Sequence, residues 1–207
     1  MAFFPAFLKL AGRRCLVVGA GKVAEEKISG LLLTGAVIRV VAPQATPRIH
    51  AWARLKKVRL IVRPFRSSDL LGAFLVVAAT SSRVLHATIY VQARRRGVLC
   101  NVVDDPDHCD FYYGAVVRRG ALQIAISTEG HSPALAQRLK KQIAREFGPE
   151  YESWLAEIGE IRKQLFAEGK VSSARRKSLL HRLASESSFV EFQRRIKRKR
   201  KHSRKSD

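Results

Sequence analysis

The chain has 207 residues, of which 46% are hydrophobic, enough for one good core and a smaller appended domain. It contains no apolar run long enough to cross a membrane, and its start lacks the basic region and cleavage site of a secretion signal, so we expect a cytoplasmic protein with no membrane partner. Three widely spaced cysteines, Cys15, Cys100 and Cys109, exclude a disulfide framework and suggest reduced thiols.

The formal net charge of +22 implies an anionic partner without identifying it. Nine Lys and Arg residues fall between Gln193 and Lys205, so residues 1–192 still carry 30 basic against 16 acidic groups. The run 194–207 is too charged to pack and lacks aromatic side chains for base stacking. We interpret it as a disordered, solvated tail and do not expect nucleic acid to be the partner.

Strand and helix patterns alternate through the first half of the chain. Short apolar runs predict strands at residues 15–18, 37–41, 58–62, 75–79 and 99–103. Helical patterns lie between them at 23–34, 49–55 and 82–96. This alternation predicts an α/β protein with a Rossmann-type parallel sheet.

The pattern changes after Asp104. Two β-like runs, 111–117 and 121–127, flank a hairpin-type turn at residues 118–120. Pro133 then opens a predicted helix over 134–147, and further helices are expected at 150–168 and 172–196. We therefore expect the chain to leave the parallel sheet for a small α+β segment and a helical end.

A glycine-rich loop follows the first predicted strand, at Gly19-Ala20-Gly21-Lys22-Val23-Ala24. Gly19 permits a tight turn, Gly21 lets the backbone approach a pyrophosphate, and Ala24 keeps helix and strand close. The position between a buried strand and an amphipathic helix is the context that a dinucleotide site requires. The alternative is a glycine turn with no ligand.

The end of the second strand lacks the acid that usually binds the ribose hydroxyls. Backbone groups around Pro43 and Gln44 are the alternative contacts. Arg39 and Arg48 lie nearby in the sequence, but neither is placed well enough to assign a 2′-phosphate contact. The residues alone do not choose between NAD and NADP.

Two polar segments follow later strands. Asp104 and Asp105 come just past the fifth strand, where ligands of open α/β sheets bind, and either is a catalytic group or part of a turn before Pro106. The second segment, residues 127–133, could bind an anion through hydroxyls and backbone amides, or Ser132 could simply cap the helix that Pro133 opens.

Five motifs in register resemble one family: residues 15–24, 41–43, 78–80, 101–104 and 127–133. From Phe3 to Glu168 the chain resembles the sirohaem synthase amino-terminal module, the precorrin-2 dehydrogenase family, some members of which are also sirohydrochlorin ferrochelatases. The resemblance implies NAD-dependent oxidation of precorrin-2 to sirohydrochlorin, with Fe²⁺ a further substrate if the chelatase activity is present. Both tetrapyrroles are polyanions, which suits the basic chain.

The resemblance also implies a homodimer with a Rossmann domain over 1–112, a dimerisation segment over 113–148, a helical domain over 149–193 and the basic tail. It assigns catalysis to Asp104. The implied cofactor contacts are Gly19, Gly21, Lys22, Val23, Ala24, Pro43, Gln44, Thr80, Asn101 and Val102. The implied substrate contacts are Ser127, Thr128, Gly130, His131 and Ser132, with Thr128 in the place where some relatives carry a phosphorylated serine.

Two alternatives stay open at this point. A ligand-sensing module that binds NAD to control a partner would explain the glycine loop, but not Asp104 or the polar segment at 127–133. His86, His108 and His131 could deliver a metal, yet their spacing forms no ligand set, so we predict no resident metal site.

Overall fold

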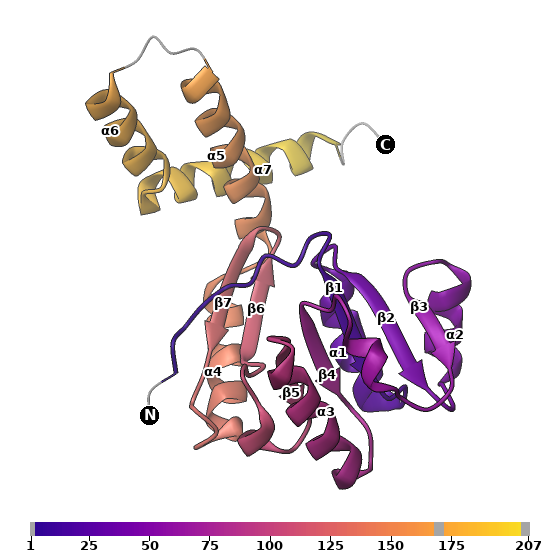
Figure 1. The fold of residues 1–207 in the computed structure, drawn as a ribbon. Coiled ribbons are helices and arrows are strands. Elements are labelled where there is room, and N and C mark those ends of the chain that lie inside the picture. The colour runs from indigo at the N-terminus through magenta and orange to yellow at the C-terminus, as the bar shows by residue number, and fades with distance from the viewer. Residues whose placement is uncertain (1–2, 168–171, 204–207) are drawn as a thin grey trace. The chain divides into compact units, whose positions relative to one another are not determined.

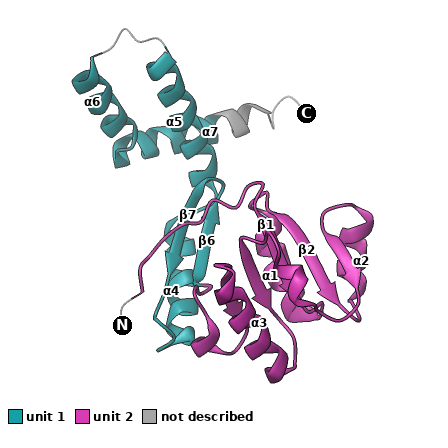
Figure 2. Cartoon of the chain, in the orientation of Figure 1, with its two compact units in different colours: residues 1–2, 114–207 teal, residues 3–113 magenta. Residues whose placement is uncertain are grey.

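The computed structural model describes residues 3–167 and 172–203, with side chains up to residue 198. The chain forms two compact units that meet in sequence between Tyr113 and Gly114 (Figure 2). The first along the chain, residues 3–113, is magenta and carries the key label unit 2, and the second, from residue 114, is teal and carries the key label unit 1. Within the described ranges, no helix is long and apolar enough to span a membrane.

The first unit is built on a parallel sheet in the order β3-β2-β1-β4-β5 (Figure 1). The strands are β1 (Arg14–Val18), β2 (Val37–Ala42), β3 (Arg59–Val62), β4 (Leu75–Ala78) and β5 (Leu99–Val102). Each end lies within one residue of the sequence prediction, because fully buried strands give continuous apolar runs. The predicted Rossmann-type sheet is confirmed.

Helices cover both faces of this sheet. On one face, α1 (Lys22–Leu32) and α2 (Pro47–Arg54) bury Ile28 and Ile49 against β1, β2 and β4. On the other face, α3 (Arg83–Arg95) and the 3-10 turn η1 (Ser67–Leu70) bury Ile89 and Leu70. Both faces of the central strands are therefore buried, and a ligand can reach this part of the sheet only at the loops that follow the strand ends.

The second unit begins with an antiparallel hairpin, β6 (Ala115–Arg119) and β7 (Leu122–Ile126), against which α4 (Pro133–Glu146) packs. Arg119 anchors the end of α4 by donating to the carbonyls of Ala144 and Phe147, each at 2.8 Å. The predicted strand over 111–117 starts too early. Residues 110 and 111 instead bond to β5: Asp110 N–H donates to the Cys100 carbonyl at 2.7 Å, and the Phe111 carbonyl accepts from the Asn101 amide at 2.8 Å.

Three helices complete the second unit: α5 (Glu150–Ala167), α6 (Ser173–Leu183) and α7 (Glu186–Ser203). Tyr151 and Trp154 of α5 pack against Phe189 of α7, with ring centroids 4.4 and 4.8 Å apart. The single helix predicted over 172–196 is two helices. Ser185 divides them, because its hydroxyl accepts the N–H of Ser188 at 3.3 Å and so caps the start of α7.

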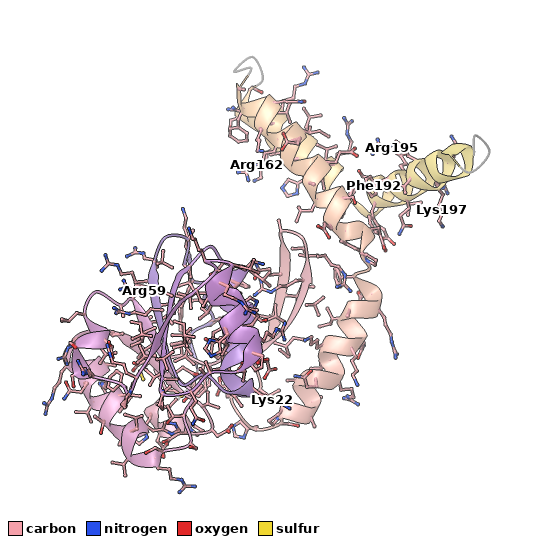
Figure 3. All side chains as sticks on the ribbon, turned by 90° about the vertical axis from the view of Figure 1, so that its right-hand side faces the viewer. Lys22, Arg59, Arg162, Phe192, Arg195 and Lys197 are labelled. Carbon is pink, nitrogen blue, oxygen red and sulfur yellow. The ribbon has the colours of Figure 1, made fainter. Side chains whose placement is uncertain are left out.

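The expectation of a disordered tail from residue 194 also differs from the structure. Helix α7 continues to Ser203, whereas residues 204–207 lie outside the described part. Lys and Arg are good helix formers, and positive charge is favourable at a helix carboxyl end. Arg195 also forms two 2.6 Å hydrogen bonds with Glu157 of α5 (Figure 3). High charge density therefore does not prevent helix formation here.

Candidate active site

A cavity of about 990 Å³ opens at the carboxyl ends of the sheet strands in the first unit. This volume is at the upper end of the range for small-molecule sites. Its wall includes eight of the residues that the sequence assigned to the site: Gly19, Gly21, Lys22, Val23, Pro43, Gln44, Thr80 and Asp104. The topology therefore brings together four segments that are far apart in the sequence.

The glycine loop turns between β1 and α1. Gly19 has φ +103°, and a Cβ there would lie 2.1 Å from the Ala79 carbonyl oxygen, so the loop fits against the end of β4 only because this residue has no side chain. Gly21 has φ −85° and open space within 4 Å of its absent Cβ. No side chain caps α1, whose first turn begins at Lys22 (Figure 3).

These features fit the pyrophosphate of a dinucleotide. The uncapped first turn of α1 directs amide N–H groups and the positive end of its dipole to the cavity, where an anion would be stabilised. The open space at Gly21 allows that anion to approach the backbone. Ala24, fully buried beneath the loop, supports the packing of α1 on β1 and does not form the wall.

The end of the cavity at β2 and β3 is formed by Pro43 and Gln44 together with Pro64 and Phe65. Sequence reasoning missed the last two, although their place directly after a parallel strand was a usable signal. Arg39 donates to the Asp69 carbonyl, and Arg48 lies 3.8 Å from Glu25, so both arginines have other partners.

The loop after β4 forms another part of the wall. Its Thr80 hydroxyl accepts the N–H of Ser82 at 3.2 Å. His86, only 6% exposed, lies with its Nε2 2.9 Å from the Thr80 carbonyl oxygen. The imidazole therefore supports this loop.

Asp104 and Asp105 differ sharply in their surroundings. Asp105 Oδ2 lies 2.8 Å from His108 Nδ1, and both side chains are about one-third exposed. Asp104 is exposed at the cavity wall, and its carboxylate has no hydrogen-bond or salt-bridge partner among the described residues. Its backbone is left-handed, with φ +59°, a conformation that Asp tolerates better than most residues. Asp104 is therefore the carboxylate that can act on a ligand.

Cys109 holds the segment that carries both carboxylates. Its sulfur accepts the Val102 N–H at 3.3 Å and lies 3.2 Å from the carbonyl oxygens of Val102 and Asp105. Burial raises the pKa of the Cys109 thiol above its ordinary value. The thiol therefore stays protonated at neutral pH and can donate to one of these carbonyls.

Two family models match the first unit and the start of the second. Residues 6–115 match a family model described as putative NAD(P)-binding, and residues 119–146 match the model of the sirohaem biosynthesis protein central region. The chain belongs to the sirohaem synthase amino-terminal module family.

Individual relatives agree with this family. The siroheme synthase of Methylococcus capsulatus is 41% identical over 143 residues, which cover 69% of this chain and 30% of that protein. Siroheme synthase 2 of Yersinia pseudotuberculosis is 35% identical over 166 residues, covering 80% of this chain and 35% of that protein. The chain thus spans about a third of the length of these relatives. A solved structure named SirC, precorrin-2 dehydrogenase, matches with a TM-score of 0.80 and 29% identity, covering 95% of this chain and all of that one.

Two residues that the family resemblance implies as cofactor contacts are not among those that line the cavity. Asn101 and Val102 lie inside β5, paired with Val77 and Ala78, rather than at the cavity wall. Val102 belongs to the core, and the Asn101 amide donates to the Phe111 carbonyl at 2.8 Å and to Cys109 Sγ at 3.4 Å. From this position inside β5, the two residues support the segment that carries Asp104.

The polar segment of the family module lies in the second unit, between β7 and α4. Ser132 caps α4 by accepting the Leu135 N–H at 3.2 Å, as the capping interpretation predicted. The Thr128 hydroxyl accepts the Ser132 N–H at 3.3 Å, and His131 N–H donates to the Thr128 carbonyl at 2.8 Å. Gly130, with φ +82°, completes this tight turn, which is stabilised by the hydrogen bonds between its own polar groups.

Neither the thiols nor the histidines form a metal centre in the described ranges, where no three His, Cys, Asp or Glu side chains are grouped to hold an ion. Burial raises the pKa of Cys15 to about 11 and that of Cys100 to about 12. Both thiols are core side chains that remain protonated at neutral pH.

Proposed function

We propose that this chain oxidises precorrin-2 to sirohydrochlorin, with NAD⁺ as the hydride acceptor. The observation that carries the proposal is one cavity in which a phosphate-binding glycine loop and the unpaired carboxylate of Asp104 share a wall. The end-to-end match to a solved precorrin-2 dehydrogenase supports this substrate. A dinucleotide sensor would need the loop but not the carboxylate.

Each part of the cavity has a separate task in this proposal. The backbone at Gly19 and Gly21 and the first-turn amides of Lys22 and Val23 bind the pyrophosphate, and Pro43 and Gln44 contact the ribose at the end of β2. Thr80 lines the part of the cavity that extends towards β5. The bound cofactor supplies the hydride acceptor.

Asp104 acts on the substrate. Oxidation of precorrin-2 gives sirohydrochlorin, NADH and one proton, so a base must take that proton as the hydride leaves. The exposed carboxylate of Asp104 has no partner in residues 3–167 and 172–198, and it can orient the macrocycle or accept the proton, with solvent as the alternative base. The Asp104 backbone is left-handed, with φ +59°, just after the end of β5.

Substrate contacts are proposed for Ser127, Thr128, Gly130, His131 and Ser132. The hydroxyls and backbone amides of this turn suit carboxylate groups of a tetrapyrrole. The net charge of +22 supports the same polyanion, because a positive surface accelerates its encounter with the enzyme.

We further propose that the chain forms a homodimer through residues 113–148. In the sequence, this segment follows the dinucleotide domain at 1–112 and precedes the helical domain at 149–193. The match of residues 119–146 to the central region of sirohaem biosynthesis proteins supports a distinct role for this segment. A two-stranded sheet such as β6–β7 is marginal alone and gains stability from further packing. Light scattering of the purified protein tests this state. The cytoplasmic location stays a prediction.

The deciding experiment is an anaerobic assay of the purified protein with precorrin-2 and NAD⁺. The proposal predicts sirohydrochlorin and NADH in equal amounts, followed by absorbance, and almost none from the Asp104→Asn variant. Binding of NAD⁺ without either product would favour the sensor.

Iron insertion is tested in the same cuvette by adding Fe²⁺ after the oxidation is complete. Insertion releases two pyrrole protons, for which Asp104 is again the available base. A rate of sirohaem formation above that without enzyme would add chelatase activity, and an equal rate would limit the chain to the dehydrogenase step.

A further inference from the structure

An arginine lies beside the ribose end of the cavity without forming part of its wall. Arg63 directly follows β3, and its N–H donates to the carbonyl of Ala42, the last residue of β2, at 3.1 Å. Arg63 is therefore next to Pro43 on the neighbouring strand. The two residues after it, Pro64 and Phe65, do contribute to the wall.

The guanidinium of Arg63 forms a bidentate pair with Asp69. Its two terminal nitrogens donate to the two carboxylate oxygens at 2.9 and 2.7 Å, and Nη1 also donates to the Pro64 carbonyl at 2.9 Å. The Asp69 side chain is 4% exposed, against 28% for Arg63. Its carboxylate also accepts the Arg66 N–H at 2.8 Å. Such bidentate, charge-assisted pairs are strong and directional.

This neighbourhood is where Rossmann sites distinguish the two nicotinamide cofactors. An acid after β2 binds the ribose 2′-hydroxyl of NAD, whereas an arginine nearby accommodates the 2′-phosphate of NADP. Here β2 ends in Ala42, Pro43 and Gln44, none of them charged. Arg63, which follows β3 at this edge of the sheet, is neutralised by its pair with Asp69. Selectivity for NAD over NADP would therefore depend on keeping the Arg63 guanidinium paired with Asp69.

We propose that Asp69 sets the cofactor preference of this site by holding Arg63 in a neutral pair, so that this arginine is not available to a 2′-phosphate. NAD is then favoured over NADP although the usual acid is absent. The inference rests on the dinucleotide site of the proposed function. It differs from a purely structural role for Asp69 at the start of η1, which predicts no change in cofactor preference.

The test measures Kd for NAD⁺ and NADP⁺ by isothermal titration calorimetry, which requires no turnover. Asp69→Asn keeps an oxygen for the Arg66 N–H but removes the charge that neutralises Arg63. The proposal predicts that the NADP⁺:NAD⁺ affinity ratio rises about tenfold or more, the size expected of a hydrogen bond to a charged group. The increase should shrink as KCl is raised.

Three control variants isolate the cause. The double variant Arg63→Met with Asp69→Asn should return the ratio to that of the wild type, because the released cation is gone. Arg63→Met alone should leave the ratio unchanged. Asp107→Asn removes one exposed carboxylate from the same unit and should also leave it unchanged. If Asp69→Asn does not fold, Asp69→Ser makes the same charge change and its hydroxyl can accept the Arg66 N–H.

Several outcomes overturn the inference. These are a wild-type preference for NADP⁺, a folded Asp69 variant that binds NAD⁺ with an unchanged ratio, or a double variant that keeps the increase. Binding of neither cofactor by the wild type would overturn the inference together with the proposed function. Selective NAD⁺ binding that responds to Asp69→Asn, without oxidation of precorrin-2, would support the inference and refute only the proposed reaction.

Discussion

Replacing Asp104 by asparagine should remove turnover while leaving the fold intact. The side chain is exposed and has no partner in the described part of the chain, so its amide analogue loses no internal bond. Asn also tolerates the left-handed backbone at φ +59°. The free energy of unfolding should therefore change by less than about 0.5 kcal/mol. Loss of a positioned acid–base group should lower kcat by roughly 10²- to 10⁴-fold.

The assay is NADH formation from precorrin-2 under anaerobic conditions, with NAD⁺ affinity measured separately. Affinity should stay near that of the wild type, because the glycine loop is untouched. Asp107→Asn, the same chemical change in an exposed residue of the same segment, should leave kcat unchanged. Asp105→Asn should mainly cost stability, by about 0.5 to 1 kcal/mol, through the lost His108 pair. Near-normal turnover by Asp104→Asn, or an equal loss in Asp105→Asn, would refute the assignment.

Three further predictions concern the cofactor loop, acid stability and substrate charge. Gly19→Ala should lower the free energy of unfolding by about 3 kcal/mol, because the new Cβ would overlap the Ala79 carbonyl and the residue has a positive φ. Gly21→Ala should keep a free energy of unfolding within about 1 kcal/mol of the wild-type value, yet calorimetry should show that it no longer binds NAD⁺. The hydrogen bonds from Arg63 lower the pKa of Asp69. The ionised carboxylate therefore stabilises the fold at pH values above the ordinary pKa of Asp, and this contribution is lost as the pH falls below about 4. Urea titrations in acid should show a weaker pH dependence for Asp69→Asn, and an identical slope would contradict this. Raising KCl from about 0.05 to 0.5 M should lower kcat/KM for the polyanionic substrate, and a salt-independent value would argue against electrostatic steering.

Local patterns were sufficient to predict the parallel sheet and the phosphate loop. Buried strands such as β1 and β4 leave continuous apolar runs, and the glycine spacing is required by the turn itself. The boundary between α6 and α7 was missed because one serine, Ser185, ends the regular pattern with a capping bond. Helix formation in the basic run was missed because composition reports charge but not the helical propensity of Lys and Arg.

The sequence by itself determined which residue types reach the ligand-binding edge of the sheet, since each loop after a parallel strand must emerge at the same side of the sheet. Only the tertiary structure decided which of two adjacent carboxylates is free, because His108 engages Asp105, whereas Asp104 has no partner within the part of the chain that the structure describes. It likewise decided that Asn101 supports the site from inside β5 and that Arg63 is neutralised by Asp69. Hydrogen-bond partners of this kind depend on the direction of side chains in space, which spacing along the chain does not encode.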